Sequence, residues 1–60
     1  MEKDFGQRLI VFRAKHNLTQ QKMAQICKVS LQTIYLLENG LQKPSKLTRQ
    51  KILSVIEKEN

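Results

Sequence analysis

The segment over residues 31–36, Leu-Gln-Thr-Ile-Tyr-Leu, carries groups suited to contacting another molecule and yet has no charge. A helix whose Ile34 points inward turns Gln32 and Leu36 outward, because successive residues are about 100° apart. An outward helix face normally carries Lys, Glu or Arg. A glutamine amide can instead pair with N6 and N7 of adenine, and apolar side chains can contact the thymine methyl group. The segment therefore has the chemistry of a helix that contacts base edges in a DNA major groove.

The charge of the whole chain also indicates a polyanionic partner. The sequence has 11 Lys and Arg residues against 5 Asp and Glu, a formal net charge of +6 at pH 7. Nine basic residues but only one acid, Glu38, lie between residues 5 and 56. Such a body favours DNA, RNA or an anionic membrane surface, although a basic surface can also serve solubility alone. RNA is the weaker alternative, because the chain lacks paired aromatic residues on which single-stranded bases stack.

The length limits the chain to one domain, which we assign to residues 1–60. A chain this short buries only about 60% of the surface that its unfolded form exposes, so an enzyme with a deep, dry pocket is not expected. Cys27 is the single cysteine, which leaves no disulfide or Cys-based zinc site and favours the reducing cytosol. No apolar run approaches the ~20 residues of a membrane span, and the polar start is unlike a signal peptide. We therefore expect no enzyme activity, cofactor, metal or membrane partner, and a cytoplasmic location.

The spacing of apolar residues predicts four helices and no strand, hence an all-α fold. Asn17 and the pair Asn39–Gly40 can adopt the left-handed conformation that ends the first and third helices. Four residues are expected to cap helix N-termini: Asp4, Thr19, Ser30 and Ser45. The residues expected to face the interior are Phe5, Leu9, Ile10, Val11, Phe12 and His16 in the first helix, Met23, Ala24, Ile26 and Cys27 in the second, Ile34, Leu37 and Leu41 in the third, and Leu47, Ile52, Val55 and Ile56 in the fourth.

The second and third helical patterns are separated only by Cys-Lys-Val, residues 27–29. Helices joined by three or four residues cross steeply, at about 90–120°, which is the geometry of a helix-turn-helix. This crossing turns the third helix, with its uncharged face, away from the interior and toward a DNA major groove.

The stretch LTQQKMAQICKVSLQTIYLLENGLQKPS, from Leu18 to Ser45, resembles the phage lambda repressor-like and Cro-like helix-turn-helix family of bacterial regulators. The shared pattern is a Thr-Gln start, an apolar-Ala pair, a Val-Ser turn, a Thr-Ile recognition helix, a Glu-Asn-Gly end and a basic-Pro-Ser exit. The resemblance implies a compact lambda repressor-like domain of four or five helices, with the helix-turn-helix formed by the second and third. It also implies a bacterial or phage transcription regulator, a repressor that binds double-stranded DNA at an operator.

The resemblance assigns roles to residues in and around this motif. Glu38 lies on the inward side of its helix, four residues after Ile34, and is implied to form a structural ion pair with Arg13. A buried carboxylate needs such a partner, because an unpaired buried charge is costly. Base contacts are implied for Leu31, Gln32, Thr33 and Leu36. Phosphate contacts are expected for Gln20, Lys22, Tyr35, Lys43, Lys46 and Arg49, among which Lys22 is a weaker candidate, as is Lys15.

The sequence departs from the family pattern at two places. Lys28 stands where the family usually has glycine, so the turn must hold a non-glycine residue near the left-handed region. The helical patterns stop after the fourth, whereas the family often has a fifth helix, which in several relatives helps to pair two subunits. We expect a homodimer on a palindrome with half-sites about one helical turn apart, formed through the apolar side of the fourth helix or only on DNA.

A function of another class stays open at this point. The outward face of the third helix, with Leu31, Tyr35 and Leu36, could dock a partner protein, as in an anti-repressor or an antitoxin. The basic body of the chain argues against this alternative. The two functions differ in their response to salt, because binding through phosphates weakens steeply as the salt concentration rises.

Overall fold

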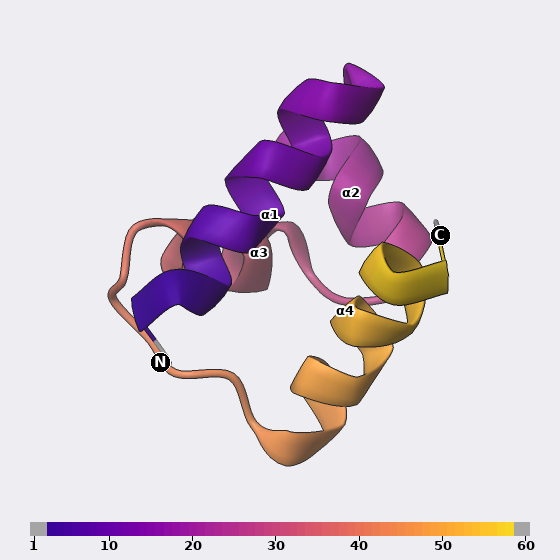
Figure 1. Ribbon diagram of the computed structural model, residues 1–60. Helices are drawn as coiled ribbons and strands as arrows, with labels where there is room; N and C mark the ends of the chain where they lie inside the picture. Colours follow the sequence, from indigo (N-terminus) through magenta and orange to yellow (C-terminus); the bar gives the residue numbers. More distant parts are fainter. Residues whose placement is uncertain (1–2, 59–60) are drawn as a thin grey trace.

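The computed structural model describes residues 3–58, with side chains from Phe5 onward, and this part of the chain forms four α-helices and no strand (Figure 1). The helices are α1 (Lys3–His16), α2 (Gln20–Cys27), α3 (Leu31–Glu38) and α4 (Lys46–Lys58). The packing contacts join α3 to both α1 and α2, and join α4 to α2. The predicted all-α fold of four helices is confirmed.

Short polar side chains begin three of the helices, as the sequence predicts. The hydroxyl oxygens of Thr19, Ser30 and Ser45 accept hydrogen bonds from the backbone N–H groups of Lys22 at 3.0 Å, Thr33 at 3.0 Å and Thr48 at 3.2 Å. Each bond satisfies one of the donors that a helix start leaves without an intrahelical partner. Asp4 does not cap α1, because it lies one residue inside that helix, and its side chain lies outside the described residues.

The first three helices also end in one common way. A residue in the left-handed region follows each of them: Asn17 with φ 58°, Lys28 with φ 61° and Gly40 with φ 70°. The N–H of the following residue then donates a hydrogen bond to the carbonyl five residues earlier in the chain. These bonds run from Leu18 to Arg13, from Val29 to Ala24 and from Leu41 to Leu36. This closing pattern caps the last carbonyls of a helix. The predicted left-handed ends are therefore confirmed at all three positions.

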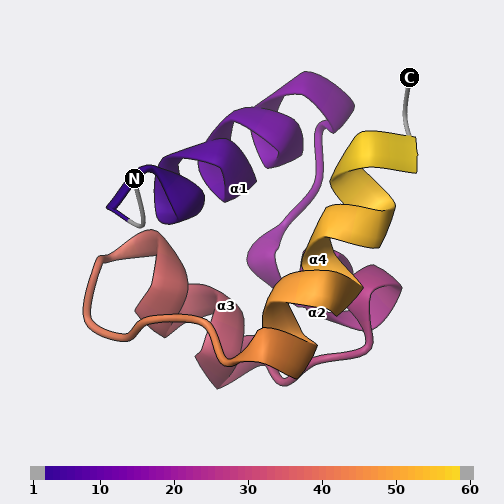
Figure 2. The ribbon, with the colours of Figure 1, turned by 60° about the horizontal axis from the view of Figure 1, so that its bottom comes forward.

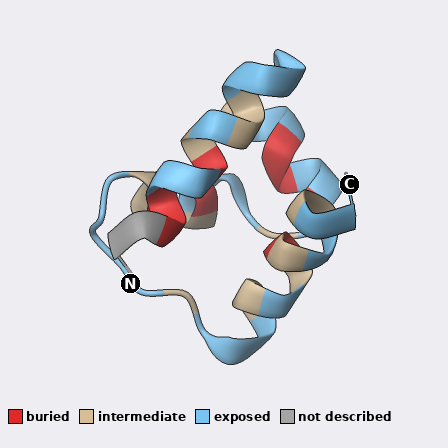
Figure 3. Ribbon diagram, in the orientation of Figure 1, coloured by how far each residue is buried: buried red, intermediate tan, exposed pale blue. Residues whose placement is uncertain are grey.

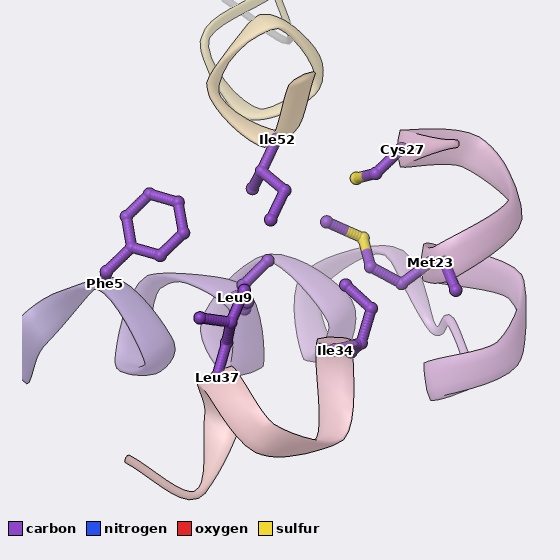
Figure 4. Packing of buried hydrophobic residues seen from close by; sticks show 8 residues of the cluster. Phe5, Leu9, Met23, Cys27, Ile34, Leu37 and Ile52 are labelled. Atoms are coloured by element: carbon purple, nitrogen blue, oxygen red, sulfur yellow. The ribbon is translucent and has the colours of Figure 1, made fainter. Parts of the chain in front are cut away.

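All four helices contribute to one small core (Figures 3 and 4). Figure 4 shows Leu9, Ile34, Met23 and Ile52 pointing toward one another from α1, α3, α2 and α4. The buried apolar residues are Phe5, Leu9, Met23, Ala24, Cys27, Ile34, Leu37 and Ile52. Half-buried residues pack around them: Phe12, Leu18, Val29, Leu53, Val55 and Ile56.

Four apolar residues predicted to face the interior are exposed instead, namely Val11, Ile26, Leu41 and Leu47. Leu41 lies beyond the end of α3, so the helical spacing that would have aligned it with Leu37 no longer applies. Leu47 precedes Ile52 by five residues, which places the two side chains about 140° apart around α4. Val11 and Ile26 lie outside the buried arcs of α1 and α2 by the same geometry. His16 is also exposed, and its ring lies 4.4 Å from the Phe12 ring, centroid to centroid.

The close approach of α1 to the end of α3 depends on Gly6. A Cβ atom at this position would overlap the carbonyl oxygen of Leu37 and lie 3.2 Å from the Cα of Glu38. The two helices therefore meet backbone to backbone, which a larger residue would prevent. This contact fixes where α3 lies relative to the rest of the protein.

Candidate nucleic-acid interface

The outward face of α3 consists of Leu31, Gln32 and Tyr35, with Thr33 and Leu36 half-buried at its edges. Leu31 is 48% exposed and Tyr35 is 49% exposed, although both are large and partly apolar. Ile34 and Leu37 occupy the opposite, buried side. The helix thus has the orientation that its sequence predicts, with Leu36 more covered than expected. Figure 2 shows α3 at one side of the molecule, with the loop that follows it curving round toward the start of α4.

The turn before α3 is short and is held by hydrogen bonds to the helices around it. It consists of residues 28–30, in which Lys28 adopts φ 61° and ψ 43° in place of the family's glycine. The Lys28 N–H bonds back to α2, and Ser30 caps α3. From α4, the Lys51 ammonium donates to the Lys28 carbonyl at 3.2 Å. The turn therefore sets the direction of α3 through bonds to three helices.

An ion pair at the far end of α3 joins it to α1. Arg13 donates from Nε to Glu38 Oε2 at 2.7 Å and from Nη2 to Oε1 at 2.9 Å, a two-bond geometry that suits guanidinium and carboxylate groups. The remaining guanidinium nitrogen of Arg13, Nη1, donates a hydrogen bond to the Leu18 carbonyl at 3.0 Å. The hydrogen bonding to Glu38, together with its negative charge, raises the pKa of Arg13 above its ordinary value, against the opposing effect of desolvation. The Glu38 side chain is only 4% exposed, whereas that of Arg13 is 22% exposed.

Gln20 belongs to the same cluster. Its amide Nε2 donates to Glu38 Oε1 at 2.9 Å, so the first residue of α2 is bonded to the last residue of α3. Glu38 thereby accepts three hydrogen bonds, which compensate for the loss of water around its carboxylate. We call Arg13, Gln20 and Glu38 the bracket, because together they fasten α3 to α1 and α2. Gln20 also stands where a helix start presents backbone N–H groups that suit a phosphate.

The other predicted phosphate residues are spread over α2, the loop after α3, and α4. Lys22, Lys43 and Lys46 are exposed, as is Lys15 at the end of α1. The guanidinium carbon of Arg49 lies 5.1 Å from the centre of the Phe5 ring, a cation–π distance, so Arg49 is half-buried against α1. Lys43 lies at a groove of about 400 Å³, which is also lined by Phe5, Gly6, Leu37, Gly40, Leu41, Gln42 and Pro44.

Two residues that position α3 were not singled out from the sequence. Gly6 interrupts an otherwise helical pattern, and such an isolated glycine can signal the close approach of another backbone. Lys51 gives no such signal, because a lysine on a surface helix is ordinary and its bond to Lys28 spans 23 residues.

Comparisons with known proteins identify the family. A family model described as helix-turn-helix matches residues 10–59, which is most of the chain. Comparisons with curated proteins and with solved structures gave no match. Among residues 3–58, no helix is both long enough and apolar enough to cross a membrane. From the matched family and the fold, the chain belongs to the lambda repressor-like and Cro-like helix-turn-helix family, a family of DNA-binding regulators.

Proposed function

We propose that this protein is a transcriptional repressor of bacterial or phage origin that binds a palindromic operator through α3 in the major groove. The observation that carries the proposal is the uncharged, exposed face of α3, which the bracket fastens to the rest of the protein. A rigidly held face of this kind can place amide and apolar groups against base edges with a fixed register. Base contacts would come from Leu31, Gln32, Thr33 and Leu36.

Phosphate contacts would hold the protein in place on both sides of α3. The proposed contacts are those of Gln20 and Lys22 at the start of α2, Tyr35 on α3, and Lys43, Lys46 and Arg49 after it. Such contacts supply affinity and orientation but carry no sequence information directly. Their number makes the affinity for DNA strongly dependent on salt.

A homodimer would supply the specificity that one small head lacks. A single module of this size buries less surface on DNA than a typical specific complex, and two copies on a palindrome double the contacts. Val55 and Ile56 on α4 are half-buried and offer apolar surface for weak self-association, which DNA would reinforce. By occupying an operator in the cytoplasm, the dimer would block access of the transcription machinery.

Selection of bound duplexes from a random pool tests this function. We expect an enriched sequence with two inverted half-sites whose centres are about 10–10.5 base pairs apart. A duplex with one half-site should bind much more weakly than one with both. If no sequence is enriched, or if the enriched sequence has a single half-site, the proposal of a palindrome-binding repressor is wrong.

A protein-docking function is the second candidate, because Leu31 and Tyr35 expose much apolar surface beside the half-buried Leu36. Exposed apolar patches often mark protein interfaces. A partner protein bound mainly through these residues would stay bound as salt rises from 50 to 200 mM, whereas DNA bound through several phosphates would lose affinity by orders of magnitude over about this range. A salt series separates the two functions.

A further inference from the structure

The one acidic side chain on α3 is not available to read a base. Glu38 is the last residue of the helix, its side chain is 4% exposed, and both of its carboxylate oxygens accept hydrogen bonds within the bracket. Among charged side chains, a carboxylate is the group that accepts a hydrogen bond from cytosine N4 in the major groove. The helix therefore lacks this means of recognising a G·C pair.

Basic side chains are also absent from α3. Arginine and lysine are the usual donors to O6 and N7 of guanine, and that pairing is the commonest specific contact in DNA complexes. The nearest lysines in the sequence are Lys28, in the turn before the helix, and Lys43, five residues after it. The face of α3 consequently offers neither of the charged groups that distinguish a G·C pair.

Several small polar groups near α3 already make hydrogen bonds within the protein. The Ser30 oxygen accepts from the Thr33 N–H, and the two hydroxyl groups are hydrogen-bonded to each other at 2.8 Å. The Asn39 amide donates to the Tyr35 carbonyl at 2.8 Å. What α3 presents outward is thus the amide of Gln32, the phenol of Tyr35, and the apolar atoms of Leu31 with the edges of Thr33 and Leu36.

We propose, on the basis of the proposed DNA-reading function, that α3 recognises a run of A·T pairs through thymine methyl groups and adenine. Leu31 would contact the C5-methyl group of a thymine, and Gln32 would bond to N6 and N7 of an adenine. The base pairs that face α3 in each half-site are therefore A·T, and Leu31 is a specificity-determining residue of this family member.

Modified bases test each contact separately. Replacing thymine by uracil removes only the methyl group, and replacing adenine by 7-deazaadenine removes only the N7 acceptor. At the position that faces Leu31, uracil should weaken binding by about fourfold per half-site, the fold-change that corresponds to about 0.8 kcal/mol for one buried carbon group. At the position that faces Gln32, 7-deazaadenine should weaken binding by about fivefold or more.

Two variants assign these losses to their residues. Leu31→Ala should bind the thymine duplex about as weakly as the wild type binds the uracil duplex, and uracil should cause it no further loss. Gln32→Ala should become insensitive to 7-deazaadenine in the same way. Both residues are exposed on α3, so neither substitution disturbs the core. Val11→Ala is the matched control, because Val11 is an exposed apolar residue on α1, and this variant should keep both penalties.

The outcomes separate this proposal from the function on which it rests. An enriched half-site with G·C pairs opposite α3, or equal wild-type affinity for the thymine and uracil duplexes, would overturn the A·T inference and leave DNA reading intact. The inference is also wrong if Leu31→Ala keeps the full uracil penalty. Absence of any enriched sequence would overturn both the inference and the proposed function.

Discussion

At the scale of single residues, Glu38 is the position on which the placement of α3 most depends. It receives hydrogen bonds from α1 and from α2, and its carboxylate is almost fully covered. Arg13, in contrast, is 22% exposed, so water can solvate part of its guanidinium when the carboxylate is lost. Breaking this pair should therefore cost less stability than breaking a pair in which both charges are fully buried.

Glu38→Ala should destabilise the fold by about 2–3 kcal/mol, below the 3–5 kcal/mol that breaking a fully buried pair costs. Urea unfolding of the wild type and the variant measures the difference. The double variant Arg13→Met with Glu38→Leu should recover much of the loss, because it removes both charges and retains apolar volume. An unchanged unfolding midpoint for Glu38→Ala would show that the bracket contributes nothing to stability.

At the scale of helices, two backbone features set the direction of α3: the contact of α1 at Gly6 and the left-handed turn at Lys28. They predict opposite outcomes for two small substitutions. Replacing Gly6 by alanine adds a carbon atom where there is no room. Replacing Lys28 by glycine removes a side chain where the backbone is strained.

Gly6→Ala should destabilise the protein by about 1–3 kcal/mol, because the added Cβ overlaps the Leu37 carbonyl and forces α1 away from α3. Alanine favours a helix over glycine by about 1 kcal/mol, so a stabilising result would mean that the two helices do not approach at backbone distance. Thermal unfolding measures the effect. Gly40→Ala is a comparison in which crowding plays no part, since a Cβ there meets no atom within 4 Å and its expected cost of about 1–2 kcal/mol comes only from the positive φ.

Lys28→Gly should stabilise the protein by about 0.5–1 kcal/mol. Glycine adopts φ 61° without the steric cost that a side chain carries there, and this gain exceeds its greater loss of backbone entropy on folding. The Lys51 bond to the Lys28 carbonyl is a backbone contact, so it survives the substitution. A lower melting temperature for Lys28→Gly would indicate that the lysine side chain itself supports the turn.

At the scale of the whole molecule, the core is so small that the burial of one thiol, that of Cys27, should affect how the stability of the protein depends on pH. Burial raises the pKa of Cys27 above its ordinary value, so the unfolded chain loses the thiol proton at a lower pH than the folded protein. Its contribution to stability is complete below the unfolded pKa and is lost as the pH rises through the folded pKa.

The stability difference between the wild type and Cys27→Ala should therefore shrink between pH 7 and pH 9.5, by up to about 1.4 kcal/mol one pH unit above the ordinary thiol pKa of about 8.5. Denaturant unfolding of both proteins at each pH measures this difference, and the comparison cancels the titration of the other groups. A constant difference over that range would contradict the burial of the thiol.

Short-range chemistry explains which parts of this molecule could be predicted from the sequence. Thr19, Ser30 and Gly40 act on their own helix ends, so their types suffice to predict where α2 begins and where α3 begins and ends. Leu41 and Gly6 could not be placed in this way. The exposure of Leu41 depends on where α3 stops, and the role of Gly6 depends on a carbonyl 31 residues away in the sequence.

The candidate site shows the same division. The outward orientation of Gln32 follows from helical spacing alone, and the partnership of Arg13 with Glu38 follows from the family resemblance. The bond from Gln20 to Glu38 does not follow from helical spacing, because it depends on how the start of α2 meets the end of α3. What the sequence leaves undetermined is thus the long-range contact between elements.

The central claim is that α3 reads sequence while the lysines around it hold the phosphates. The most direct test compares Gln32→Ala with Lys43→Ala on one selected duplex and one scrambled duplex over a salt series. Gln32→Ala should lose about 1–3 kcal/mol on the selected duplex and almost nothing on the scrambled one. Lys43→Ala should weaken both about equally and reduce the slope of log affinity against log salt by about one unit. Equal losses on both duplexes for Gln32→Ala would contradict the claim and favour protein docking through this face.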